Sequence, residues 1–129
     1  MSEIKIGIQL FTLRDHISNY EDTDKTFAYL KNELGVDAVQ ISAIGDFPAE
    51  QHAELVKKYN LDVCVTHKPW ERIINDTDKL IEEHIALGCD QIGLGCMPDE
   101  YRTDLEAVRK FIALANEVGK KMKAKGLTF

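Results

Sequence analysis

The side chains best suited to chemistry fall within or just after short β-strand patterns. His67 follows the alternating run Leu61–Thr66, and Gln9 and Gln40 lie inside two similar runs. An imidazole and two amides can donate and accept hydrogen bonds, so these three residues are suited to contact a hydroxyl or carbonyl group of a ligand. The alternatives are that His67 packs against Trp70 and that Gln9 and Gln40 bond each other, because buried amides need partners either way.

Arg14, Phe11 and Trp70 offer a second kind of contact. The Arg14 guanidinium can reach an anionic group of a ligand, or it can pair with Asp15 or Glu21. The rings of Phe11 and Trp70 can form an apolar wall against a ligand ring, or they can fill a core. Each of these residues therefore carries a binding interpretation and a structural one.

Cysteines and the remaining histidines complete the set of reactive side chains. The three cysteines, Cys64, Cys89 and Cys96, include no CxxC pair and lie in or beside strand patterns, where inert thiols are common. Such cysteine usage is typical of a reducing compartment, and we expect a cytoplasmic protein without a zinc site. The other histidines, His16, His52 and His84, lie in a polar loop or on predicted helices, and we expect them to be solvated.

Four strand-then-helix units must position these residues. Strand patterns cover 4–10, 38–42, 61–66 and 89–95, and a fifth begins at Leu127. Helical spacing of apolar residues covers about 22–34, 48–59, 76–87 and 99–125. Strict alternation of strand and helix predicts a parallel sheet with right-handed crossovers. The chain ends as the fifth strand opens, so we expect 1–129 to be a single partial domain.

Strand parity separates two architectures. One face of the strands is branched and apolar: Ile6, Ile8, Val39, Ile41, Val63, Val65, Ile92 and Leu94. The other face is small or polar: Gly7, Gln9, Gln40, Ser42, Cys64, Thr66, Gln91, Gly93 and Gly95. This one-sidedness favours helices outside and a partly polar lumen inside, as in the N-terminal half of a (β/α)₈ TIM barrel. The alternative is a flavodoxin-like doubly wound sheet, which predicts a phosphate or flavin ligand.

Composition narrows the range of partners. The 129 residues carry a formal net charge of −6, which argues against non-specific nucleic-acid binding and against an anionic membrane surface. No apolar run approaches the roughly 20 residues of a membrane span.

Five segments together resemble one known family. They are Ile6–Asp15, Gly35–Ser42, Val63–His67, Ala86–Ile92 and Lys125–Phe129. In this order and at this spacing they resemble the first four strands, and the start of the fifth, of the sugar phosphate isomerase/epimerase family. That family belongs to the xylose isomerase-like TIM barrels, which also include endonuclease IV. The resemblance covers essentially the whole chain.

The resemblance implies a function for a complete barrel. Many members bind a divalent metal and move a proton beside a sugar carbonyl, using acidic residues and a histidine after strands five to eight. This chain stops before those positions, so we expect no catalytic or metal residue in it and no turnover by it alone. The residues that the resemblance leaves for contact with a sugar or sugar phosphate are His67, Gln9, Gln40, Trp70, Phe11 and Arg14. Exposed strand edges predict a homo-oligomer. The alternative function is a non-enzymatic sugar-binding or self-associating half-barrel module.

Overall fold

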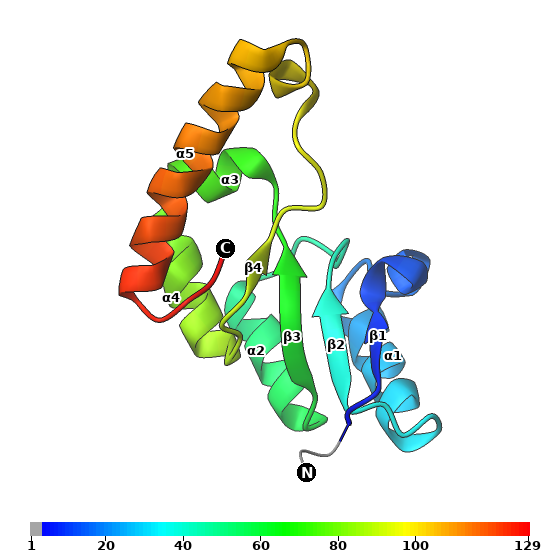
Figure 1. The fold of residues 1–129 in the computed structure, drawn as a ribbon. Coiled ribbons are helices and arrows are strands. Elements are labelled where there is room, and N and C mark those ends of the chain that lie inside the picture. Colours follow the sequence, from blue (N-terminus) through cyan, green and yellow to red (C-terminus); the bar gives the residue numbers. More distant parts are fainter. Residues whose placement is uncertain (1–3) are drawn as a thin grey trace.

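The computed structural model describes residues 4–129 as a four-stranded parallel sheet with helices between the strands (Figure 1). In chain order the elements are β1 (Gly7–Gln9), η1 (Leu10–His16), α1 (Tyr20–Asn32), β2 (Ala38–Ile41), α2 (Ala49–Lys58), β3 (Asp62–His67), α3 (Trp70–Asn75), α4 (Thr77–Leu87), β4 (Ile92–Gly93), η2 (Asp99–Tyr101) and α5 (Leu105–Ala124). No helix in this described range is long and apolar enough to cross a bilayer.

The strand order decides between the two predicted architectures. The strands follow one another as β1-β2-β3-β4, all parallel. A fifth position continues this order, because Thr128 forms a parallel bridge with Gln91. A doubly wound sheet reverses its strand order at a switch point, whereas a barrel adds each new strand at the same edge. The half-barrel prediction is therefore confirmed, and the flavodoxin-like alternative is wrong.

One face of the sheet carries the core. Figure 1 shows α1, α2 and α4 behind the strands, with no described helix in front of them. Val39, Ile41 and Val63 pack there with Phe27 of α1 and Leu55 of α2. A second cluster joins β4 to the C-terminal helices, through Ile92, Leu80, Val118 and Met122 among others. The opposite face has no helix over it in the described part of the chain.

A β-bulge in β3 corrects the predicted parity of that strand. Val39 pairs with Val63, but the next residue, Gln40, pairs with Val65, so Cys64 is an extra residue and is exposed. A bulge shifts every later side chain to the opposite face. Thr66 consequently faces the helices at 0% exposure, and Val65 lies beside Gln40 on the open face. The predicted positions of Val65 and Thr66 were wrong for this reason.

Several element ends also differ from the prediction. β1 begins at Gly7, and Ile6 before it is 75% exposed rather than packed under a helix. The predicted helix over 99–125 is a short η2 turn followed by α5, which starts where the Asp104 carboxylate accepts a hydrogen bond from the Ala107 amide at 2.9 Å. This N-cap fixes the start of α5. Helix α3 was not predicted.

Candidate functional site

Gln40 and His67 meet at the carboxyl ends of β2 and β3. The Gln40 Nε2 atom lies 2.9 Å from His67 Nε2, and both side chains are half-buried. An amide nitrogen only donates, so His67 Nε2 accepts this hydrogen bond and its proton resides on Nδ1. The bulge explains why the histidine reaches the open face, since without it His67 would continue the Val63 face.

Two glycines of β4 and its loop make room for the His67 ring. A Cβ at Gly93 would lie 2.9 Å from His67 Cδ2, and a Cβ at Gly95 would lie 3.5 Å from His67 Nδ1. Gly93 therefore allows the ring to rest against the backbone of β4. The absence of a side chain at Gly95 leaves Nδ1 uncrowded, so this N–H can donate to a ligand oxygen.

Gln9 extends the same polar row onto β1. It pairs in register with Gln40, so both side chains stand on the open face. The Gln9 residue is exposed, and its side chain makes no hydrogen bond within residues 4–129. The two glutamines do not bond each other, because Gln40 is engaged with His67. Gln9 retains its full hydrogen-bonding capacity.

Phe11 and Arg14 lie together on η1. The Arg14 guanidinium carbon is 4.7 Å from the centre of the Phe11 ring, and its Nη1 donates to the Phe11 carbonyl at 3.0 Å. Within the described range Arg14 forms no ion pair with Asp15 or Glu21. Phe11 is 50% exposed and lines the cleft described below. The pair is a cation–π contact at the rim of the open face.

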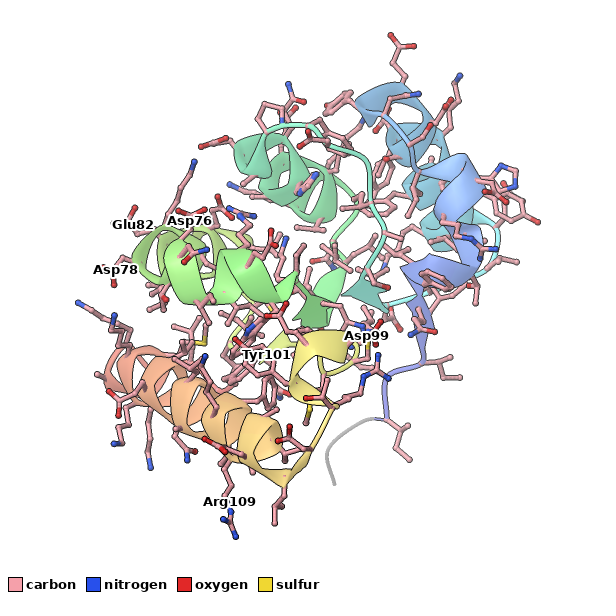
Figure 2. The ribbon with its side chains drawn as sticks, turned by 90° about the horizontal axis from the view of Figure 1, so that it is seen from above. Asp76, Asp78, Glu82, Asp99, Tyr101 and Arg109 are labelled. Atoms are coloured by element: carbon pink, nitrogen blue, oxygen red, sulfur yellow. The ribbon has the colours of Figure 1, made fainter. Side chains whose placement is uncertain are left out.

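Trp70 lies in an aromatic cluster with Tyr101, Phe111 and Phe129. Its ring centre is 4.7 Å from that of Phe111, and the residue is only 5% exposed. Figure 2 shows Tyr101 pointing from η2 into the interior, whereas Arg109 points from α5 into solvent. Trp70 thus occupies the core-filling position, with its ring packed between Phe111 of α5, Tyr101 and Phe129. The Trp70 Nε1 atom has no hydrogen-bond partner in the described residues.

A cleft of about 910 Å³ opens beside the ends of β2 and β3. Its walls are Phe11, the loop of residues 42–48, His67 to Pro69 and the ends of the helices behind them. Arg72 of α3 binds Glu83 of α4 there, with Nη2 at 2.6 and 2.7 Å from the two carboxylate oxygens. The cleft therefore runs from the histidine on the open face to charged groups in the helix layer.

Three polar residues in this cleft were missed by sequence reasoning. Lys68 is half-buried, and its ammonium group forms no hydrogen bond or ion pair with any described residue. Burial, and then the neighbouring Arg72 charge, holds the pKa of the Lys68 ammonium below its ordinary value. Ser42 is 6% exposed, and neither its Oγ nor His52 Nε2 has a partner among the described residues. Lys68 follows Thr66 by two positions, so the bulge is also what directs it toward the helices.

Two of the histidines that we expected in solvent are not exposed: His84 is buried and His52 is half-buried. His84 is 1% exposed and joins two layers, with Nδ1 2.7 Å from the Leu80 carbonyl and Nε2 2.7 Å from Thr66 Oγ1. His52 packs edge-on against Phe47, and burial lowers its pKa to about 4. Burial lowers the pKa of His84 also. The spacing of His84 with Leu80 and Ile81 placed it on the apolar stripe of α4, which was the available signal. His16 is exposed as expected.

The metal chemistry of the family has no ligand set in this part of the chain. Among residues 4–129, no group of three or more His, Cys, Asp or Glu side chains is placed to hold a metal ion. Asp76, Asp78 and Glu82 point outward from the α4 region in Figure 2 and do not face the strand ends. The side chains of the described residues therefore do not form a divalent-metal site.

Comparison with known proteins identifies the fold. No family model matches the sequence, and no curated protein matches it significantly. An AP endonuclease of family 2 from Brucella melitensis superposes with a TM-score of 0.64 at 21% identity, over 81% of this chain and 47% of that one. A sugar phosphate isomerase/epimerase from Parabacteroides distasonis superposes with a TM-score of 0.63 at 16% identity, over 98% of this chain and 50% of that one. A xylose isomerase domain containing protein from Salmonella typhimurium superposes with a TM-score of 0.58 at 14% identity, over 94% of this chain and 46% of that one.

These similarities are at the level of fold, since all the identities are low. The chain spans about half the length of the solved structures that it matches. Its sequential parallel strands, one covered face and one open face agree with that share of a closed barrel. The chain therefore has the fold of half of a TIM barrel, similar to the xylose isomerase and sugar phosphate isomerase/epimerase structures that it matches.

Proposed function

We propose that this chain forms the substrate-contact half of a sugar or sugar phosphate isomerase or epimerase. The observation that carries the proposal is the Gln40–His67 pair, which stands on the open face at the carboxyl ends of two neighbouring strands. Active sites of TIM barrels lie at this end of the strands. A resident histidine whose second nitrogen remains available as a donor suits recognition of a sugar hydroxyl or carbonyl.

Each predicted contact has a distinct task in this proposal. His67 Nδ1 donates to a sugar oxygen while Gln40 fixes the tautomer and orientation of the ring. Gln9, one strand away and unbonded, can pair with a neighbouring hydroxyl of the same ligand. Phe11 presents an exposed ring face or edge at the rim, and Arg14 is held against it. Trp70 supports this region from the core and does not touch the ligand.

Proton transfer beside the carbonyl, in this proposal, requires groups other than those of residues 1–129. In the family that the chain resembles, a divalent metal polarises the carbonyl, and carboxylates move the proton. We propose that these groups belong to the second half of a barrel and that 1–129 alone binds the substrate without turning it over. This chain's own residues hold and orient the sugar.

Sugar titration with a matched pair of histidine variants tests the proposal. We expect amide NMR signals around Gln40 and His67 to shift as a ketose or ketose phosphate is added. His67→Ala should weaken this binding by about tenfold, which corresponds to the loss of one good hydrogen bond. His16→Ala, which removes an exposed histidine elsewhere, should leave it unchanged. If no member of a panel of ketoses, aldoses and their phosphates shifts these signals, the proposal is wrong.

We also propose that a second copy of the chain covers the open face. The β1 strand is an edge, and Ile4 and Ile6 before it are 91% and 75% exposed. The Thr128 bridge marks the opposite edge. Two copies related by a twofold axis would place each β1 edge against the other's Thr128 edge and supply eight strands. Light scattering after size exclusion should give at least twice the 14.6 kDa chain mass; a strict monomer at all concentrations would contradict this.

The exposed edges also favour one alternative function, a self-associating sugar-binding module without catalysis. Sugar titration below and above the concentration at which the chain self-associates separates the two, because the module would bind sugar as the dimer, whereas the substrate-contact half would also bind it as a monomer. We further propose a cytoplasmic location, since Cys64, Cys89 and Cys96 are all free thiols.

A further inference from the structure

Lys68 places a half-buried ammonium group in the cleft, within the field of the Glu83 carboxylate but not bonded to it. Within the described range this ammonium group makes no hydrogen bond or ion pair. The nearest carboxylate in the helix layer, that of Glu83, is already bound by both of its oxygens to Arg72. A buried charge without a partner is unfavourable, and an anion brought by a ligand would provide that partner.

The surroundings of Lys68 are suited to an oxyanion. Helix α2 begins at the cleft with Pro48 as its N-cap, and no side chain caps it. The amide groups at such a helix start attract anions. The Ser42 Oγ atom in the same cleft wall has no hydrogen-bond partner among the described residues, and Ser42 is only 6% exposed. Because Ser42 lines the cleft, we infer that a change of its side-chain rotamer allows this hydroxyl to donate to a ligand there. A bound phosphate would receive hydrogen bonds from all three sources.

The other charged groups of the cleft do not oppose this reading. Lys79 of α4 adds a second free positive charge, and Asp46 on the exposed loop adds one negative charge. Arg72 and Glu83 neutralise each other. The net charge of the residues that line the cleft is therefore +1, whereas the net charge of the whole chain is −6. The cleft is thus a local positive site on an acidic protein, which favours an anionic ligand at this point.

The same cleft also reaches His67 and Phe11 on the open face. We propose that the substrate is a phosphorylated sugar, with its phosphate bound by Lys68, Ser42 and the start of α2 while its sugar oxygens face His67. This inference rests on the proposed sugar-binding function and extends it, because it selects the phosphorylated form over the free sugar. It assigns Lys68 and Ser42 as ligand-binding residues that determine specificity.

Three titrants and two lysine variants test this assignment. Inorganic phosphate should bind the wild-type chain saturably and shift the amide signals of residues 42–50 and 68. Lys68→Met keeps the aliphatic stem and removes the charge, so we expect phosphate affinity to fall about tenfold or more. Lys57→Met makes the same change of net charge at an exposed position outside the cleft, and it should alter phosphate affinity by less than about twofold. Circular dichroism of both variants checks that they fold, with Ser42→Ala as a second cleft variant.

Comparing a ketose phosphate with its unphosphorylated ketose separates the two proposals. We expect the phosphate ester to bind more tightly to the wild type, and this advantage to disappear in Lys68→Met. If both sugars bind equally and depend on His67, the phosphate assignment is overturned and the sugar function stands. If inorganic phosphate binds through Lys68 but no sugar depends on His67, the anion site stands and the sugar function fails. Equal phosphate binding by Lys68→Met and wild type overturns the site itself.

Discussion

The two faces of this sheet differ in the burial and hydrogen bonding of their polar side chains. On the helix-covered face, two fully buried polar side chains bond each other: Thr66 and His84 are 0% and 1% exposed, and His84 also bonds the Leu80 carbonyl. On the open face, Gln9 and Cys64 are exposed, and the Gln40–His67 pair still has a free donor. The difference shows that the covered face carries the packing, whereas the open face leaves polar side chains accessible, as the proposed ligand and partner roles require.

The largest expected loss of stability comes from truncating a large side chain in the core of the covered face. Phe27 of α1 is 0% exposed in the first core cluster, so Phe27→Ala should lower the free energy of unfolding by about 3–5 kcal/mol. Gln9→Ala on the open face should change it by less than about 0.5 kcal/mol. Urea unfolding of both variants measures the contrast. Similar losses in the two would mean that the open face also carries packing energy.

A smaller loss should follow from breaking the buried polar pair. The His84 Nδ1–H donates to Leu80, so Nε2 must accept the hydrogen bond from Thr66. Thr66→Val keeps the shape and removes the donor, and we expect a loss of about 1–3 kcal/mol of unfolding free energy. Thr128→Val, at an exposed position, is the matched control. A neutral Thr66→Val would show that this bond contributes nothing to the covered face.

The smallest expected effect is a pH dependence that comes from the helix layer. His52 titrates near pH 4 when folded, against an ordinary pKa of 6.5, so the unfolded chain binds more protons between these values. Stability should therefore be highest above about pH 6.5 and fall as the pH is lowered toward 4. Partial exposure of the ring limits the His52 share to about 1–2 kcal/mol. The lowered pKa of His84 acts in the same direction.

Chemical unfolding at several pH values measures this dependence. His52→Leu should flatten the curve between pH 6.5 and 4, whereas His16→Leu should leave it unchanged, because His16 is exposed. The lowered pKa values of Asp24 and Asp37 act only at lower pH, since carboxylates of ordinary pKa 3.8 lose their stabilising charge below this window. A flat wild-type curve would mean that His52 is hydrated in the folded chain.

Sequence patterns predicted the architecture but not every side-chain direction. Alternation of strands and helices predicted the parallel order, and lumen parity placed Gln9 and Gln40 correctly on one face. The single bulged residue Cys64 then reversed the orientation of everything after it in β3. Local alternation contains no signal for an extra unpaired residue, because the bulge arises from pairing with β2. The direction of His67 was for this reason decided by tertiary structure.

The helix-side half of the cleft was unpredictable for a related reason. Ser42, His52 and Lys68 come from a loop, a helix and a strand end, and only the folded chain brings them to one cleft. Trp70 was expected near the strand ends, and it does follow β3, but the unpredicted α3 helix turns it into the aromatic cluster. Short helices without a long apolar stripe give a weak periodic signal, so their effect on neighbouring side chains escapes sequence reasoning.

Thiol labelling tests the contrast between the two faces most directly. Cys64 lies on the open face of β3 and is exposed, whereas Cys89 is 3% exposed and burial raises its pKa. Iodoacetamide rates, read by mass spectrometry against the exposed Cys96 as reference, should show Cys64 reacting rapidly in dilute solution and Cys89 protected. Cys64 should slow as concentration rises and a second copy covers the face. Protection of Cys64 at every concentration, or labelling of Cys89 as fast as Cys64, would contradict a sheet with one covered and one open face.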